Sequence, residues 1–254
     1  MALGGTARAT ISGRFGREDE RSDLVARILT FVTERRLASG ERLPSERELA
    51  ERFAVGRNAV REAIAVLETV RMVERRPNSG IYLRSVDRDG SLDALVLRAD
   101  LGVPLDAAEV GELIELRRIL EVQGTELAGQ RRQADDLAHI DAMLAAGRTT
   151  IAASENFAER DAEFHLAVAE ATRNRVLLRV VNSFYMLSRT RRRHYFADGR
   201  RAPEAQRQHE AMAASIRAGD GPGAAALMRA HLQSAEAYWH ELLQRRPPGG
   251  EAAS

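Results

Sequence analysis

The feature that most constrains the fold is the stretch 43–86, LPSERELAERFAVGRNAVREAIAVLETVRMVERRPNSGIYLRSV. Ser45, with Glu48 three residues later, forms a capping-box pattern and predicts the start of a short helix. The run Ala54-Val55-Gly56 predicts a tight turn, and a second helix is expected from Arg57. A hairpin with a glycine at its tip follows. This order of elements predicts a winged helix-turn-helix, which places one helix in the major groove of DNA.

The second helix of this motif has an apolar face and a basic face. The apolar residues recur at helical spacing and are expected to face the core: Val60, Ile64 and Leu67. Arg57, Asn58 and Arg61 fall on the outer face near the helix N-terminus. Arg bonds guanine or phosphate in a bidentate way, and Asn pairs with adenine, so these residue types suit a helix that reads DNA. The alternative is a small helical hairpin with a solvated Arg/Glu face.

Residues 24–86 resemble the DNA-binding domain of the GntR family of bacterial transcription regulators. The matching segments are LASGERLPSERELAERFAV, GRNAVREAIAVLE and the wing NSGIYL. The resemblance implies that DNA is contacted by Arg47, Arg57, Asn58, Arg61 and Gly80, the last in a wing near the minor groove.

One position departs from the family pattern. The family usually has Ser or Thr just before the first Arg of the reading helix, where a hydroxyl caps the helix and touches phosphate. This chain has Gly56 there. Gly is a tolerable N-cap, so the helix is still expected to form. The phosphate contact is then lost or made by the backbone N–H.

The positive charge of this chain is local. The formal net charge is only +1 over 254 residues, so the chain does not coat nucleic acid by bulk charge. A cluster of arginines between residues 57 and 84 instead predicts a focused basic patch. The absence of cysteine excludes disulfides and thiolate metal ligands. No apolar run reaches the length of a membrane span, and the first 20 residues lack the apolar region of a secretory signal. We therefore expect a cytoplasmic protein without a membrane partner.

The length is sufficient for two domains, each with its own core. We predict a disordered arm over 1–20, a DNA-binding domain over 21–86, a polar linker over 87–91, a helical domain over 92–245 and a disordered tail over 246–254. From Leu92 to Gln244 almost every segment has a helical period, interrupted by short breakers. This pattern predicts six or seven helices in an antiparallel bundle, and hence a mainly α fold.

The helical region resembles the FCD ligand-sensing domain, which marks the FadR-like branch of the GntR family. The matching segments are ELRRILE at 115–121, DAEFHLAVAEATRN at 161–174 and QHEAMAASIRAGDGPGAAALMRAHL at 208–232. Together with the N-terminal match, the resemblance covers nearly the whole chain, with the domains in the family's order. It implies an all-helical bundle that binds a small carboxylate effector.

Four residues form a candidate metal site. Asp161 and His165 are four apart on one predicted helix, so they project from one face, and His209 and His231 lie on later helices. A carboxylate with three imidazoles suits Zn, Ni, Mn or Fe, although a lone His on a helix is more often a packing residue. Many FCD domains bind a divalent metal through an Asp-x-x-x-His pair and two later histidines. The resemblance therefore implies that all four residues hold a divalent metal, with Zn the first choice.

The resemblance also implies a site for a small organic acid near the metal. Arg117 in ELRRILE matches a basic position that often reaches the ligand, and Asn174 matches a polar residue of the pocket wall. Tyr185 and Arg189 lie at i and i+4 on the next predicted helix and are expected to line the same cavity. The alternative is that the basic residues here face solvent, as most of the arginine run 191–193 must.

These features together predict a metabolite-responsive transcription regulator. We expect a homodimeric repressor that binds a double-stranded DNA operator and is released by a small organic acid, although activation stays open. A second class is a metal-dependent enzyme that acts on small carboxylates through activated water. No separate general base stands out for such an enzyme, and it would leave the DNA-binding motif unexplained. A third interpretation is a DNA-binding scaffold with a purely structural metal.

Overall fold

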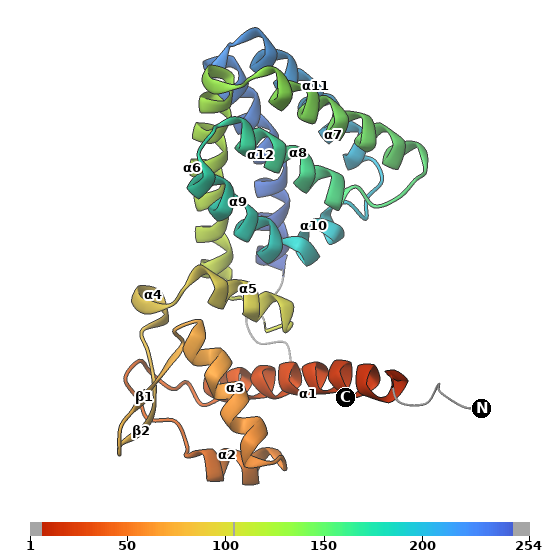
Figure 1. Ribbon diagram of the computed structural model, residues 1–254. Helices are drawn as coiled ribbons and strands as arrows, with labels where there is room; N and C mark the ends of the chain where they lie inside the picture. Colours follow the sequence, from red (N-terminus) through yellow and green to blue (C-terminus); the bar gives the residue numbers. More distant parts are fainter. Residues whose placement is uncertain (1–6, 104, 246–254) are drawn as a thin grey trace, which may run out of the picture. The chain divides into compact units, whose positions relative to one another are not determined.

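The computed structural model describes residues 7–103 and 105–245, with side chains described from residue 20 except at 86, 87 and 240–245. The chain forms two compact units, which divide between Leu105 and Asp106. Across the described ranges, helices predominate and a small two-stranded sheet is present (Figure 1). No helix in these ranges combines the length and the apolar character needed to cross a membrane.

The N-terminal unit is a winged helix-turn-helix with one helix before it and two after it, so this part of the predicted fold is confirmed. Its elements are α1 (Ala7–Glu34), α2 (Glu46–Phe53), α3 (Arg57–Thr69), β1 (Val73–Arg76), β2 (Gly80–Leu83), α4 (Val86–Asp89) and α5 (Leu92–Asp100). Strands β1 and β2 pair antiparallel, with Val73 opposite Leu83, and form the wing.

The turn between α2 and α3 forms as the sequence predicts. The Glu48 carboxylate accepts a hydrogen bond from the Ser45 N–H at 2.7 Å, and the Ser45 hydroxyl accepts one from the Glu48 N–H at 3.3 Å. Ala54 ends α2 in the left-handed conformation. Gly56 is the N-cap of α3 in extended conformation, without a side-chain cap. Capping therefore sets the start of both helices.

Two boundaries differ from the prediction. Helix α1 begins at Ala7, inside the stretch 1–20 that was expected to be disordered. No proline interrupts this stretch, so the sequence holds no strong helix breaker there. The units divide after α5, later than the predicted linker at 87–91, because Ala94 and Val103 are buried in the N-terminal core. Residues 1–6 and the predicted tail 246–254 lie outside the described residues.

The C-terminal unit is a helical bundle, as predicted. In its described part it holds seven helices and no strand: α6 (Ala107–Arg131), α7 (Ala134–Ala152), α8 (Ala158–Ala171), α9 (Arg175–Leu187), α10 (Arg189–Tyr195), α11 (Arg201–Ala218) and α12 (Gly221–Arg245). Helix α8 packs against α6, α7, α9 and α10, and α12 packs against α6 and α11 (Figure 1). Side chains on the inner faces of α8, α11 and α12 are therefore directed toward a shared interior.

Helices α6 and α12 run antiparallel and cross closely where two glycines meet. A Cβ atom at Gly129 would lie 2.7 Å from the Cα atom of Gly221, and one at Gly221 would lie 2.6 Å from the Glu126 carbonyl oxygen. Both obstacles are backbone atoms, so neither can move aside as a flexible side chain would. The crossing thus depends on the absence of side chains at these two positions.

The Gly129→Ala variant should therefore lose stability. The added methyl group must separate α6 from α12, and overpacking of this kind costs about 1–3 kcal/mol. The control is Gly111→Ala on the same helix, where an added Cβ meets no atom within 4 Å. That change removes a flexible helical glycine and should stabilise the chain by roughly 0.5–1 kcal/mol. Equal stabilities of the two variants in urea unfolding would contradict the close crossing.

Candidate metal centre, sensing cavity and DNA-reading groove

An open groove lies between the reading helix α3, the start of α2 and the wing. Six arginines line it, opposed by one acidic residue, Glu46: the six are Arg42, Arg47, Arg57, Arg61, Arg75 and Arg76. Gly80 also lines the groove, at a φ of 132° that favours glycine. The structure thus brings together four of the five predicted DNA contacts. Asn58 is exposed on α3 but does not line the groove.

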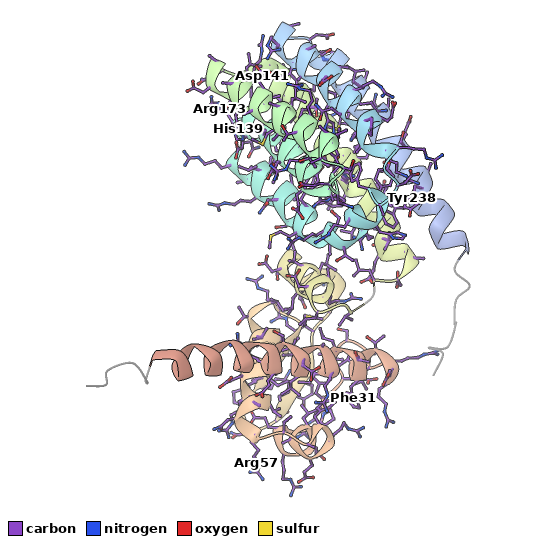
Figure 2. All side chains as sticks on the ribbon, turned by 90° about the vertical axis from the view of Figure 1, so that its right-hand side faces the viewer. Phe31, Arg57, His139, Asp141, Arg173 and Tyr238 are labelled. Atoms are coloured by element: carbon purple, nitrogen blue, oxygen red, sulfur yellow. The ribbon has the colours of Figure 1, made fainter. Side chains whose placement is uncertain are left out.

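The groove arginines differ in how firmly they are held. The Arg61 Nε atom lies 2.8 Å from a Glu46 carboxylate oxygen, and Arg75 pairs with both Glu46 and Glu68, at 3.5 and 2.8 Å. Arg57 is exposed and projects from the unit's surface (Figure 2), with no ion pair in the described part of the chain. Arg57 is therefore free to bind an anion, whereas Arg61 must exchange its contact with Glu46.

The four predicted metal ligands converge inside the helical unit. Asp161 and His165 come from α8, His209 from α11 and His231 from α12, and all four are buried. Their candidate ligand atoms lie within 4.8 Å of one another. The Asp161 Oδ1 atom is 3.6 Å from the Nε2 atoms of both His165 and His209 and 4.0 Å from that of His231. Three helices thus direct four donor atoms toward one point.

Polar contacts behind the rings orient two of these imidazoles, an ion-pair contact at His165 and a hydrogen bond at His231. The Nδ1 atom of His165 contacts the Glu121 carboxylate, and the Nδ1 atom of His231 lies 2.6 Å from the Gln208 side-chain oxygen. Both partners are acceptors, so we assign the proton of each ring to Nδ1. The two Nε2 atoms, which lie 3.2 Å apart, then direct lone pairs at each other, a contact that a cation between them would relieve. Metal-binding histidines typically have this arrangement.

His209 gives the clearest sign that the cluster suits a cation. Its Nε2 atom is buried without a hydrogen-bond partner among the described residues, and its ring stacks on Phe164 at a centroid distance of 4.0 Å. An unsatisfied buried nitrogen costs free energy unless another group satisfies it. A divalent cation at the meeting point would accept this lone pair, so the residues present fit a metal.

The ionisation states also suit metal ligands. Burial raises the pKa of Asp161, but the hydrogen bond and the charge of His165 outweigh burial and lower that pKa. Burial lowers the pKa of His231 to about 3, and burial together with the neighbouring imidazoles lowers the pKa of His209 well below its usual value. Burial lowers the pKa of His165 as well, but the Glu121 and Asp161 carboxylates outweigh burial and raise that pKa, so a cation must displace the second proton of this ring. At neutral pH Asp161 is therefore ionised, and His209 and His231 are neutral. These are the forms that bind a cation.

A buried polar network supports the cluster from α6 and α9. Glu121 accepts hydrogen bonds from the Arg117 Nε atom at 2.7 Å and from the Tyr185 hydroxyl at 2.9 Å, and Arg117 also donates to that hydroxyl at 2.8 Å. Burial raises the pKa of Glu121, but Arg117 and His165 outweigh it and hold that pKa at about 2. The sequence analysis missed Glu121, although its spacing of four from Arg117 in ELRRILE was a usable signal.

A cavity of about 340 Å³ opens beside the cluster. Asp161 and His231 form part of its wall, together with Arg117, Arg192 and Gln208. A volume of this size is at the lower end of the range for small-molecule sites. Two of the four metal-site residues therefore face the same cavity as four arginines, Arg117, Arg192, Arg200 and Arg201.

The four predicted effector residues do not all reach this cavity. Arg117 lines it, and Tyr185 lies behind Arg117 as its buried hydrogen-bond partner. Asn174 is instead the N-cap of α9, where its side-chain oxygen accepts hydrogen bonds from two backbone N–H groups at 3.1 Å. Arg189 is exposed and pairs with Glu159 at 3.1 Å. The placement expected for Asn174 and Arg189 is thus not observed.

A helix break explains the misplacement of Arg189. Helix α9 ends at Leu187 and α10 begins at Arg189, with Ser188 between them. The i, i+4 register from Tyr185 therefore does not continue, and Arg192 is buried on the cavity wall instead. The sequence has neither Gly nor Pro at this break, so the usual signal for a helix end is absent.

Comparison with known proteins matches both units. Residues 21–83 match the family described as bacterial regulatory proteins, gntR family, and residues 112–234 match the FCD domain. The chain is 31% identical to the HTH-type transcriptional regulator LutR of Bacillus subtilis over 223 residues, covering 82% of this chain and 97% of LutR. It is 30% identical to the galactonate operon transcriptional repressor of Escherichia coli over 186 residues, covering 73% and 81%.

A solved structure supports the fold. The structure of Lar from Listeria monocytogenes matches with a TM-score of 0.62 at 18% identity, covering 87% of this chain and 97% of that one. At this level of identity the likeness concerns the fold alone.

The Arg117→Met variant should be strongly destabilised. Removing one partner of a buried ion pair leaves the other charge uncompensated, which costs about 3–5 kcal/mol. The control is Arg118→Met, because Arg118 is the exposed neighbour and its loss should change stability by less than about 0.5 kcal/mol. Guanidinium unfolding of both variants measures the difference, and similar stabilities would contradict the network.

The same network predicts a dependence on pH. Because the folded chain holds the pKa of Glu121 at about 2, below its ordinary 4.5, this carboxylate stabilises the fold above pH 4.5 and ceases to do so as the pH falls toward 2. Without Arg117 that contribution should already be lost at a higher pH.

Proposed function

Because the chain belongs to the gntR family of bacterial regulatory proteins, we propose that it is a repressor that leaves its operator when a small organic acid binds beside a divalent metal. The chain is a metabolite-responsive, DNA-binding transcription regulator, and the relatives that it matches over most of its length are a transcriptional regulator and an operon repressor. For the same reason it is not an enzyme. The main observation that supports a metal and an acid effector is the buried cluster of Asp161 and three histidines, part of which lines a cavity.

The basic groove of the N-terminal unit is the proposed DNA contact. Arg57, Asn58 and Arg61 lie at the start of α3, where they reach base edges or phosphates if α3 enters the major groove. Arg47 contacts the backbone, and Gly80 lets the wing approach the minor groove. Two such units in a homodimer would read the two halves of a pseudo-palindromic operator. The excess of arginine on the groove wall supports this assignment.

The metal is held by Asp161, His165, His209 and His231, with Zn the first choice and Ni, Mn or Fe as alternatives. When bound, the metal would supply a Lewis-acidic centre for a carboxylate group. Glu121 holds the ring of His165, and Gln208 holds that of His231. Because the ligands come from α8, α11 and α12, a metal would join three helices and stabilise the folded state.

The effector is a small organic acid in the adjoining cavity. Arg117 lines this space and can donate hydrogen bonds to a carboxylate beside the metal. The galactonate operon repressor of Escherichia coli is similar to this chain, and its name refers to an acid of this general class. Binding of the acid changes DNA affinity only if the two arrangements of the regulator differ in affinity for the acid.

DNA binding should depend on two arginines of α3, Arg57 and Arg61. Replacing Arg57 or Arg61 with Ala should cost about 1–3 kcal/mol of operator binding, because each loses a base or phosphate contact. The operator is obtained by selection from a random duplex library, and gel shifts at fixed salt measure the affinity. Arg207→Ala, an exposed change in the helical unit, is the control with the same loss of charge. Unchanged operator affinity in both α3 variants would contradict the assignment of α3 as the helix that contacts DNA.

Metal content and effector response should be lost together in His209→Ala. This variant removes a ligand without altering the DNA-binding unit, so unliganded operator binding should persist. The matched control is His139→Ala, since His139 lies at the periphery of the helical unit (Figure 2) with its side chain 48% exposed. Elemental analysis and operator release by lactate or galactonate give the two readouts.

Two outcomes would count against this account. Wild-type protein that stays metal-free after incubation with Zn, Ni and Mn would remove the metal centre. A His209→Ala protein that binds no metal yet still responds to the acid would leave the metal a structural role only.

A further inference from the structure

Arg192 is a buried cation on the cavity wall that has no carboxylate partner. It is 6% exposed and forms part of the wall that also contains Asp161. Its N–H groups donate to neutral oxygens alone: the Ser188 hydroxyl at 3.3 Å, the Tyr185 carbonyl at 2.9 Å and the Ala158 carbonyl. Within the described ranges no acidic side chain pairs with it. Its positive charge is therefore solvated by dipoles but is not neutralised.

Arg192 differs from Arg117, because only Arg117 has a carboxylate that compensates its charge. Arg117 lines the same cavity, but its charge is compensated by Glu121 at 2.7 Å. The Tyr185 ring, 4.8 Å from the Arg192 guanidinium carbon, offers a cation–π contact but no countercharge. Burying an unpaired charge is costly, and the cost is removed when an anion binds. The other two arginines of the cavity wall, Arg200 and Arg201, pair with Asp198. Among the described residues of the wall, Arg192 is therefore the arginine without a carboxylate contact.

The position of Arg192 limits the length of a ligand that reaches both it and the metal centre. The Ala158 carbonyl that Arg192 contacts lies three residues before Asp161 on α8, a rise of about 4.5 Å along the helix. Arg192 is thus held about one helical turn from the metal ligands. Guanidinium groups favour bidentate pairing with carboxylates, and the three bonds named above leave two of its five N–H donors available.

We propose that the effector is a short diacid, which places one carboxylate at the metal centre and its second carboxylate on Arg192. This inference rests on the proposed function, because the first carboxylate needs the metal. A metal held by one carboxylate and three neutral imidazoles keeps a net positive charge, so each end of the diacid meets a cation. A monoacid would leave Arg192 unpaired.

The wild-type protein offers a direct test without mutation. The metal-loaded full chain is titrated by calorimetry with malonate, succinate and glutarate, each beside its monomethyl ester. At least one diacid should bind about tenfold or more tightly than its ester, the difference expected for one charged hydrogen-bonded pair. Equal affinity of every diacid and its ester overturns the inference while leaving metal-centred sensing intact.

Lactate and galactonate are titrated in parallel. They show whether a negative result contradicts the diacid inference alone or also the proposed function. If they bind and no diacid does, the diacid inference fails alone. If no acid binds to metal-loaded protein and none releases the operator, the proposed function fails with it.

Substitutions at Arg192 then test whether this residue causes the preference for a diacid over its ester. Arg192→Met should lower diacid affinity about tenfold or more and leave ester affinity unchanged. Arg189→Met on the same helix is the matched control, since Arg189 is exposed, and it should bind as wild type does. Arg192→Lys keeps the charge and should retain part of the preference if Arg192→Met fails to fold by circular dichroism. A folded Arg192→Met protein that still prefers the diacid overturns the inference.

Discussion

The buried carboxylate of Asp161 is the group around which the helical unit is arranged. It is 3% exposed, and removing a charge from water to this extent is costly without compensation. Three imidazoles on three helices each place an Nε2 atom within 4.0 Å of one carboxylate oxygen, and the raised pKa of His165 or a bound cation supplies the compensating charge. Because His209 and His231 are far from Asp161 in sequence, the cluster links α8 to α11 and α12. A cation at this point would satisfy all four donors at once.

The groups behind the cluster give it a defined geometry. Glu121 and Gln208 hold two of the rings, and Arg117 and Tyr185 hold Glu121. A buried network of this kind is stabilising only when every member is satisfied, which the unpartnered nitrogen of His209 prevents in the absence of a cation. The proposed sensing site and the stability of the helical unit thus involve the same side chains.

Much of the fold could be predicted from the sequence because its signals act over a few residues. The features that could not be predicted depend on contacts between distant residues. The capping box at Ser45 and the turn before Gly56 act within a few residues, so the sequence predicts the helix-turn-helix closely. The spacing of Asp161 and His165 places both on one face for the same reason. Arg192 was missed because the break at Ser188 follows from packing and carries no local signal. Asn174 was misassigned because a polar side chain next to a helix start serves equally well as a cap.

X-ray absorption at the edge of the bound metal tests the central claim most directly, because it reports the ligand atoms themselves. The account predicts a first shell of nitrogen and oxygen at about 2.0–2.2 Å for zinc, with the multiple-scattering signature of three imidazoles. Loss of one imidazole contribution is expected in His231→Ala. A first shell of oxygen alone, or an unchanged imidazole signature in that variant, would place the metal elsewhere and contradict the assignment.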